Sequence, residues 1–184
     1  MNAMLGGVVT SELRWQVGSA EGFEALVQSR LDGCYRLAAV LLGDRAEAED
    51  AVHDAVVRAQ RSWAGLRDGG AAAAWLDRIV VNECRDRLRR RRVGRAIVAA
   101  QPPVDLTSSP VDAGSAERSA LRDAIGVLSP DHRVVVVLRY LQDLSVDEIA
   151  ARTGTPAGTV KSRLHHALRE LRAAYDAAER HDDR

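Results

Sequence analysis

Hydrophobic positions in this chain of 184 residues recur every three or four residues, which is the period of helices with one apolar face. In residues 21–92 this period predicts three helices, and Asp44 is placed to cap the second of them. The predicted buried positions are Phe23, Leu26, Val27, Leu31, Cys34, Leu37, Ala38, Leu41 and Leu42 in the first helix, Ala48, Ala51, Val52, Ala55, Val56, Ala59 and Trp63 in the second, and Trp75, Leu76, Ile79, Val80, Cys84 and Leu88 in the third.

A second helical block covers residues 117–178. Ser129 followed by Pro130 is typical of the start of a helix, with the serine as its cap and the proline in its first turn. The apolar run 134–138 could on its own form a strand, but no turn signal flanks it, so we predict a helix.

Residues 144–171 have the pattern of a helix-turn-helix. Ser145 and Glu148 form a capping box, Gly154 suits a left-handed turn, and Thr155 and Pro156 suit the start of a longer helix. The longer helix is predicted to bury Val160, Leu164, Ala167, Leu168 and Leu171. Its polar side carries groups that can bond base edges or phosphates in a major groove: Thr159, Lys161, Ser162, Arg163, His165, His166 and Arg169. An ordinary helical hairpin with a solvated basic face would have the same spacing.

Between the two blocks, residues 93–116 hold three of the five prolines and no periodic apolar pattern, which predicts a flexible linker. The sequence therefore predicts an all-α fold of two small helical domains, residues 21–92 and 117–178, joined by that linker. Residues 1–20 are an N-terminal extension and residues 179–184 a tail.

The charge is distributed in blocks although its sum is zero, with 26 basic and 26 acidic residues. Residues 44–54 carry a net charge of −4, whereas residues 85–95 carry +6 and residues 161–172 carry +3. Basic blocks on two helices fit a polyanion such as DNA, and an acidic helix would need a basic partner surface. Negative charge at a helix start is also stabilising without any partner.

Polar residues of the third helix form one stripe at the spacing i, i+4, i+7, i+8 and i+11. They are Arg78, Asn82, Arg85, Asp86 and Arg89. Guanidinium groups bind phosphates and stack on unpaired bases, and Asn and Asp can bond base edges. A solvated helix end is the competing interpretation of the arginines. Trp75 could lie along the path of a DNA strand, but core packing fits it better.

No catalytic or metal-binding pattern is present, so we expect neither an enzyme nor a bound cofactor. The five histidines lack a metal-ligand spacing, and Cys34 and Cys84 lie on apolar faces as small hydrophobic residues. No apolar run is long enough to cross a membrane, and no signal peptide is recognisable, so we expect a cytoplasmic protein.

Three segments together resemble bacterial sigma-70-family RNA polymerase sigma factors of the extracytoplasmic-function (ECF) group. GDRAEAEDAVHDAVVRAQRSW and AWLDRIVVNECRDRLRRRR are similar to parts of sigma region 2, and LSPDHRVVVVLRYLQDLSVDEIAARTGTPAGTVKSRL is similar to sigma region 4. The resemblance implies a dissociable subunit that binds core RNA polymerase, directs it to promoters and helps to melt DNA.

The resemblance also implies roles for individual residues. Asp50, Val52, His53 and Val56 would dock on the clamp helices of the largest polymerase subunit. The stripe on the third helix would capture the melted minus-10 element, and the polar side of the last helix would read the duplex minus-35 element. His53, His166 and Leu168 stand where the family commonly has Gln or Arg.

Factors of this group are often held inactive by an anti-sigma protein, but the sequence identifies none. The alternative function is a free-standing helix-turn-helix regulator that binds duplex DNA without polymerase. The acidic helix and the two-domain layout speak against it.

Overall fold

The computed structural model describes residues 15–99 and 123–182, and within these ranges every regular element is a helix. The elements are α1 (Ala20–Leu42), α2 (Arg45–Ser62), the 3-10 turns η1 (Trp63–Gly65) and η2 (Gly69–Ala71), α3 (Ala72–Ala99), α5 (Pro130–Tyr140), α6 (Val146–Thr153) and α7 (Ala157–Asp182). The predicted all-α fold is confirmed. The extension up to residue 14, residues 100–122 of the predicted linker and its surroundings, and residues 183–184 lie outside the described residues.

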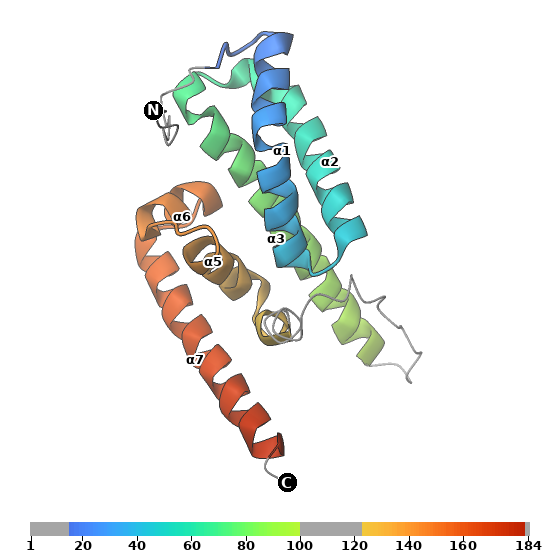
Figure 1. Ribbon diagram of the computed structural model, residues 1–184, viewed down its shortest axis with the longest axis vertical. Coiled ribbons are helices and arrows are strands. Elements are labelled where there is room, and N and C mark those ends of the chain that lie inside the picture. The colour runs from blue at the N-terminus through green and yellow to red at the C-terminus, as the bar shows by residue number, and fades with distance from the viewer. Residues whose placement is uncertain (1–14, 100–122, 183–184) are drawn as a thin grey trace, which may run out of the picture.

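The first three helices form a bundle whose ends follow from local sequence signals (Figure 1). The side chain of Ser19 accepts a hydrogen bond from the backbone N–H of Gly22 and caps α1, which ends at Gly43 in the left-handed conformation. Asp44 caps α2 by accepting from the N–H of Glu47, as predicted. The helix α3 continues through Ala99 and so extends beyond residue 92, where the sequence suggested a linker.

Aromatic side chains close one end of this bundle. The Trp63 ring lies 5.6 Å from that of Phe23 and 5.9 Å from that of Trp75, and its indole N–H donates to the carbonyl oxygen of Ser19 at 2.8 Å. Trp75 is half-buried against Trp63, so it packs in the core of the bundle, as favoured from the sequence.

The second half consists of α5, α6 and α7. Residues 134–138 are helical, as predicted, and Ser129 caps α5 with Pro130 in its first turn. The capping box of Ser145 and Glu148 is present, and Gly154 turns the chain in the left-handed conformation between α6 and α7. The helix α7 begins at Ala157, one residue after the proline that was expected in its first position.

The prediction that Leu168 is buried in the apolar face of α7 is wrong, because 44% of its surface is exposed. At 100° per residue it lies at the edge of the stripe that Val160, Leu164, Ala167 and Leu171 share, so it is only partly covered.

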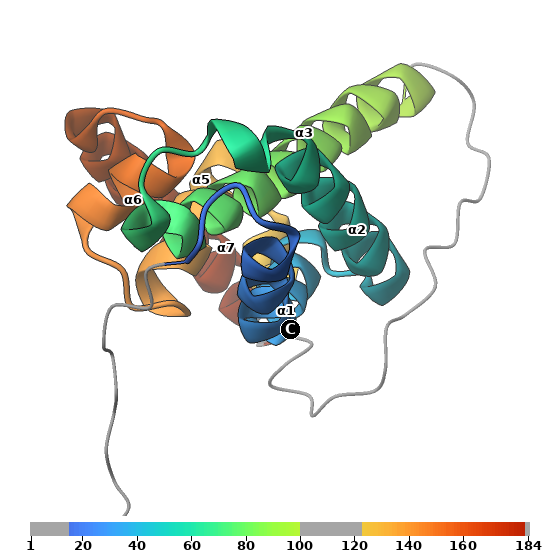
Figure 2. The same cartoon turned by 90° about the horizontal axis from the view of Figure 1, so that it is seen from above.

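The two halves lie against each other (Figures 1 and 2), and buried side chains from both form one apolar core. The fully buried members of one continuous cluster come from α1, α2, α3, α5, α6 and α7 and include Leu41, Val52, Val80, Cys84, Val135, Leu138, Ile149 and Val160. All five residues of the run 134–138 are buried, because α5 contacts α1 and α3 as well as α6 and α7. A helix that is apolar around its whole circumference needs neighbours on every side.

Cys34 and Cys84 are buried as free thiols in this core, as expected. Within residues 15–99 and 123–182, none of the helices has the length and apolar character that a membrane span requires.

Candidate nucleic-acid interface

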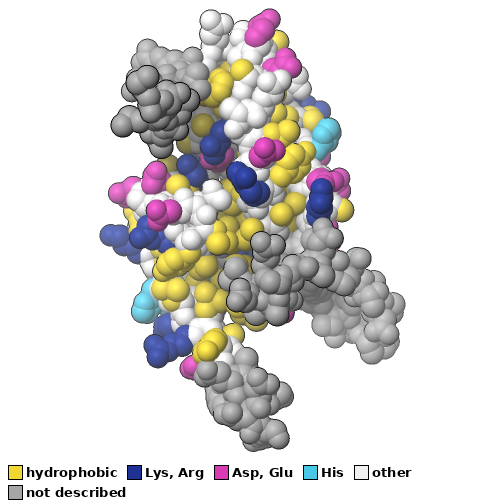
Figure 3. All heavy atoms as spheres, in the orientation of Figure 1, with side chains coloured by type: hydrophobic (Ala, Val, Ile, Leu, Met, Phe, Trp, Pro, Cys, Tyr) yellow, Lys and Arg dark blue, Asp and Glu magenta, His cyan; other side chains and the backbone are white. Residues whose placement is uncertain are grey.

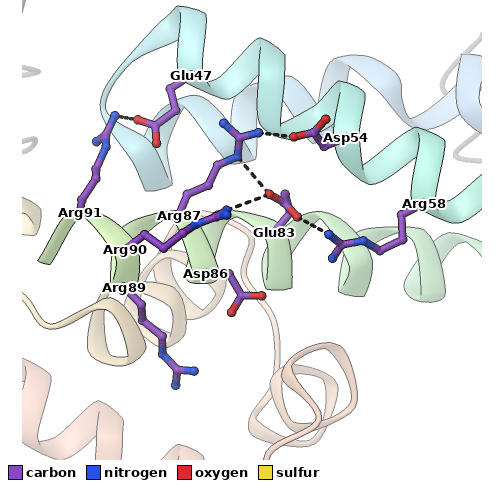
Figure 4. A pocket seen from close by; sticks show the side chains of 9 residues that line it. All are labelled: Glu47, Asp54, Arg58, Glu83, Asp86, Arg87, Arg89, Arg90 and Arg91. Carbon is purple, nitrogen blue, oxygen red and sulfur yellow. Dashed lines mark hydrogen bonds and ion pairs between the residues drawn. The ribbon is translucent and has the colours of Figure 1, made fainter. Parts of the chain in front are cut away.

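The predicted stripe of α3 faces the second half of the molecule. Arg89 donates two hydrogen bonds from one nitrogen to the carboxylate of Asp131 in α5, at 3.0 and 2.9 Å. The guanidinium of Arg78 lies against Gly154, in the turn between α6 and α7. Figure 4 shows Asp86 and Arg89 projecting from α3 on the side opposite to its ion pairs with α2.

Two further members of the stripe have polar atoms that are buried without a hydrogen-bond partner among the described residues. These atoms are Oδ1 of Asn82 and Nε of Arg85. Both residues are partly covered rather than exposed. A buried polar atom without a partner costs about 1–3 kcal/mol, so these two side chains are poorly satisfied in this arrangement.

Asp131 is the centre of the charges between the two halves. Besides Arg89, the guanidinium of Arg163 in α7 lies 3.7 Å from its Oδ2 atom, and the charge of Arg85 also acts on it. Partial burial raises the pKa of the Asp131 carboxyl, but the hydrogen bonds from Arg89 and the three positive charges outweigh burial and hold that pKa below its usual value. The carboxylate is therefore ionised in neutral solution.

The opposite side of α3 is tied to α2 by a buried carboxylate (Figure 4). Glu83 is only 3% exposed and pairs with three guanidinium groups. Arg58 of α2 lies 2.9 Å away, and Arg87 and Arg90 of α3 itself lie at 3.1 and 3.4 Å. The basic block 85–95 is thus divided between two sides of the helix, and only one side matches the predicted stripe.

The acidic residues of α2 complete this network. Arg87 also pairs with Asp54, and Arg91 pairs with Glu47. Together with the Glu83 pairs they line an open hollow of about 670 Å³ between α2 and α3 (Figure 4). Much of the acidic block 44–54 is therefore neutralised within the chain, and the face seen in Figure 3 carries both basic and acidic side chains.

The residues predicted to contact polymerase differ in their exposure. Asp50 and His53 are exposed on α2, and Val56 is half-buried beside an apolar hollow between α1 and α2. Val52 is 0% exposed, so its side chain is not at the surface in this structure, and its contact with polymerase stays a prediction. It points into the core because it lies one turn from Ala48 and Val56 on the face of α2 that packs against α1 and α3.

The helix α7 presents most of its predicted polar side to solvent. Thr159, Lys161, Ser162, His165, His166 and Arg169 are all exposed. Arg163 is the exception, since it is half-buried, donates to the hydroxyl of Thr155 at 3.3 Å and lies beside Asp131.

Three histidines gather where α5 meets α7. The ring of His132 stacks on that of His166 at 6.3 Å, and His165 meets His166 edge-on at 5.7 Å. The Nδ1 atom of His132 lies 2.9 Å from the carboxylate of Glu170. Among the described residues, no cluster of His, Cys, Asp or Glu has an arrangement that could hold a metal ion.

Sequence reasoning missed the two buried carboxylates of α3. Asp77 is 3% exposed and accepts hydrogen bonds from Arg30 of α1 at 2.7 and 2.9 Å, and Arg152 of α6 lies 3.5 Å away. Glu83 had one local signal, because Arg87 and Arg90 follow it at i+4 and i+7 on the same face. The partners Arg30 and Arg58 are remote in sequence and left no such signal.

Two family models match the chain in separate segments. The model described as Sigma-70 region 2 matches residues 26–93, and the one described as Sigma-70, region 4 matches residues 118–171. The first segment contains the stripe of α3 and the second contains α5, α6 and the start of α7.

Curated relatives match over most of their length. The RNA polymerase sigma-E factor of Streptomyces avermitilis is 37% identical over 155 residues, which cover 84% of this chain and 86% of that protein. The ECF RNA polymerase sigma factor SigL of Mycobacterium tuberculosis is 34% identical over 162 residues, with 84% and 92% covered.

Two solved structures have a similar fold. The sigma factor RpoE of Bartonella quintana, in complex with the anti-sigma factor NepR, has a TM-score of 0.65 at 25% identity and covers 85% of this chain and 98% of its own. CnrH, in complex with the cytosolic domain of CnrY, has a TM-score of 0.62 at 25% identity, with 87% and 91% covered.

Proposed function

Because this chain belongs to the sigma-70 family of RNA polymerase sigma factors, in its ECF group, we propose that it is a promoter-specificity subunit that reads two DNA elements with two different helices. It binds core RNA polymerase and promoter DNA in the cytoplasm and catalyses no reaction itself. The stripe of α3 captures melted bases of the minus-10 element. The polar side of α7 reads the duplex minus-35 element.

The observation that carries this assignment is the presence of a separate polar face on each matched region. On α7, the second helix of the helix-turn-helix, six hydroxyl, imidazole and cationic side chains are exposed, and the first helix, α6, is capped at both ends. On α3, Asn82 and Arg85 retain polar atoms that bases and phosphates would satisfy. Opening DNA without ATP is physically feasible, because captured bases offset the few kcal/mol that unstacking each base costs.

A third partner follows from the relatives. The solved RpoE and CnrH structures are complexes with NepR, an anti-sigma factor, and with CnrY. We extend this to the present chain and expect an anti-sigma protein that competes with polymerase for it.

Transcription tests the assignment. Core polymerase and this protein, applied to fragmented genomic DNA in a run-off screen, are expected to start transcripts at a small set of promoters that core polymerase alone does not use. If no fragment responds while the protein binds duplex DNA by itself, the chain is a free-standing regulator instead.

Asp50 offers a test of the polymerase contact. It is exposed on α2 and, among the described residues, forms no ion pair, so its charge is available to a basic surface. Replacing it by arginine should weaken binding to core polymerase about tenfold or more, because like charges then face each other. The change is measured as the dissociation constant of the complex with core polymerase.

The matched control for that variant is Asp32→Arg, which makes the same charge change at an exposed position of α1. Binding should be nearly unchanged in the control. Equal affinities for the two variants would remove Asp50 from the contact surface.

A further inference from the structure

In this structure the two predicted DNA-binding faces meet at a single carboxylate. Arg89, from the stripe of α3, and Arg163, from the polar side of α7, lie 2.9 and 3.7 Å from the same Oδ2 atom of Asp131. Arg85 is close enough for its charge to act on the same group. The guanidinium groups of Arg89 and Arg163 therefore lie close to each other, on the two sides of one carboxylate oxygen.

That arrangement is incompatible with simultaneous reading of two promoter elements. By their names the minus-10 and minus-35 elements are centred about 25 base pairs apart, which corresponds to roughly 85 Å at 3.4 Å per base pair. Arginines that share one carboxylate cannot contact both elements. The second half must move away from α3 before a promoter is engaged at both sites.

Two side chains of the stripe are poorly satisfied where α3 faces the second half, in contrast to the buried pairs on the other side of α3. Oδ1 of Asn82 and Nε of Arg85 are buried without partners among the described residues. Arg89, by contrast, has its charge neutralised by Asp131. A carboxylate that accepts two bonds from an arginine imitates a phosphate, whereas nothing in α5 replaces the base edges that Asn82 would contact.

Apolar contacts hold the halves together around these groups. The run 134–138 is buried on all sides because α5 lies against α1 and α3, and Leu41, Cys84 and Leu88 belong to the same cluster. Arg133 adds a hydrogen bond to the carbonyl oxygen of Leu41 at 3.1 Å. The closed arrangement thus has its own stability without any third molecule.

We propose that this conformation is an autoinhibited state of the free chain, in which Asp131 acts as a latch by taking the place of the separate DNA phosphates that Arg89 and Arg163 would each contact. The functional meaning of the latch rests on the proposed promoter function, but its existence does not. Apolar contacts supply most of the closing free energy, and Asp131 sets how strongly the two arginines are withheld from DNA. Core polymerase, by binding the halves at separate sites, favours the open state.

The interdomain distance in the free chain tests the latch directly. Spin labels on cysteines introduced at Ala46 of α2 and Ala173 of α7, both exposed, report that distance by pulsed electron resonance. Burial raises the pKa of the native Cys34 thiol to about 11 and that of Cys84 to about 12, so these two thiols react slowly near neutral pH. The label then goes to the introduced positions.

The decisive variant is Asp131→Arg, which places a fourth positive charge beside Arg85, Arg89 and Arg163. The unmodified chain is expected to give one short, narrow distance distribution, and the variant a longer and broader one. Adding Arg89→Asp to the variant restores an ion pair of reversed polarity and should recover much of the short distance. An unchanged distribution in Asp131→Arg, or a broad one in the unmodified chain, would overturn the proposal.

Asp147→Arg is the matched control, because Asp147 also lies in the first turn of a helix, α6, and is exposed. It makes the same charge change at a helix start without touching an arginine of the stripe, so the distance should not change. Circular dichroism of each variant separates opening from unfolding, since an opened chain keeps its helix content.

The milder variant Asp131→Asn connects the latch to DNA. Binding of the free chain to a fork-junction DNA, single-stranded over the minus-10 element, should tighten about two- to fivefold, the range expected from losing one partly exposed ion pair. If Asp131→Asn lengthens the distance between the labels but leaves the affinity for the fork-junction DNA unchanged, Asp131 does not compete with DNA and the proposal is overturned. If the distance measurements show the latch but the chain does not bind polymerase, the proposed function is contradicted and the proposed latch is still supported.

Discussion

Replacing Glu83 by alanine is expected to lower the free energy of unfolding by about 2–4 kcal/mol and the melting temperature by about 6–12 °C. The carboxylate is 3% exposed and joins three guanidinium groups from α2 and α3. Without it, Arg87 stays largely buried with Asp54 as its remaining partner. Arg58 and Arg90 are mostly exposed and can turn to water, which keeps the loss below that of a fully buried pair.

Glu49→Ala is the control for this change, because Glu49 also pairs with an arginine, Arg45, within a helix. That pair is exposed, so its removal should cost only about 0.3–0.5 kcal/mol. Chemical denaturation of both variants measures the difference. Similar small losses would mean that the three arginines around Glu83 find other partners and that the carboxylate does not fix α2 against α3.

The second large effect is expected from Arg85→Ala combined with Arg89→Ala. Each side chain is expected to bond a phosphate or base of the melted strand, and a hydrogen bond from a charged donor contributes about 1.5–3 kcal/mol. Open-complex formation by the polymerase containing the double variant should fall about 100-fold or more. The slope of the logarithm of the binding constant against the logarithm of the salt concentration should also decrease by about one for each arginine that is removed, because each loses one phosphate contact.

If the stripe binds DNA, this double variant should still bind polymerase, because both arginines lie on α3 and the proposed polymerase contact lies on α2. Permanganate reactivity of the melted bases measures the opening, and Arg36→Ala, at an exposed position of α1, controls for the loss of a positive charge. The double variant also removes the bonds from Arg89 to Asp131. The two halves of the free chain should therefore separate more readily, although the promoter DNA is not melted. Normal melting by the double variant would reduce the stripe to a solvated helix face.

Local features of this fold could be read from the sequence because each is specified by neighbouring residues. Asp44 and Ser129 cap helices that begin at the next residue, and Gly154 adopts the left-handed conformation that a tight turn demands. The partner of each group lies within four residues along the chain. The stripe of α3 and the polar side of α7 follow from the same short-range geometry.

The remaining features depend on contacts between distant segments. Asp77 and Glu83 look like ordinary helix-surface residues until Arg30 and Arg58 are brought to them from α1 and α2. Arg89 and Asp131 are 42 residues apart in sequence.

One feature of the sequence indicates that the helix at residues 130–140 has several neighbours. Five consecutive apolar residues, 134–138, cannot all be covered by one neighbouring helix. Their presence in a helix already implied that α5 packs against more than one neighbouring helix, and the structure shows that α1 and α3 are among these neighbours.

Site-specific crosslinking within the complete promoter complex tests the division of labour between α3 and α7 most directly. A photoreactive amino acid at Asp86 and, in a separate protein, at His166 places the probe on each exposed face. In the presence of core polymerase, position 86 should crosslink to the melted minus-10 element and position 166 to the duplex minus-35 element. Crosslinking of both positions to one element, or the same pattern without polymerase, would contradict the account.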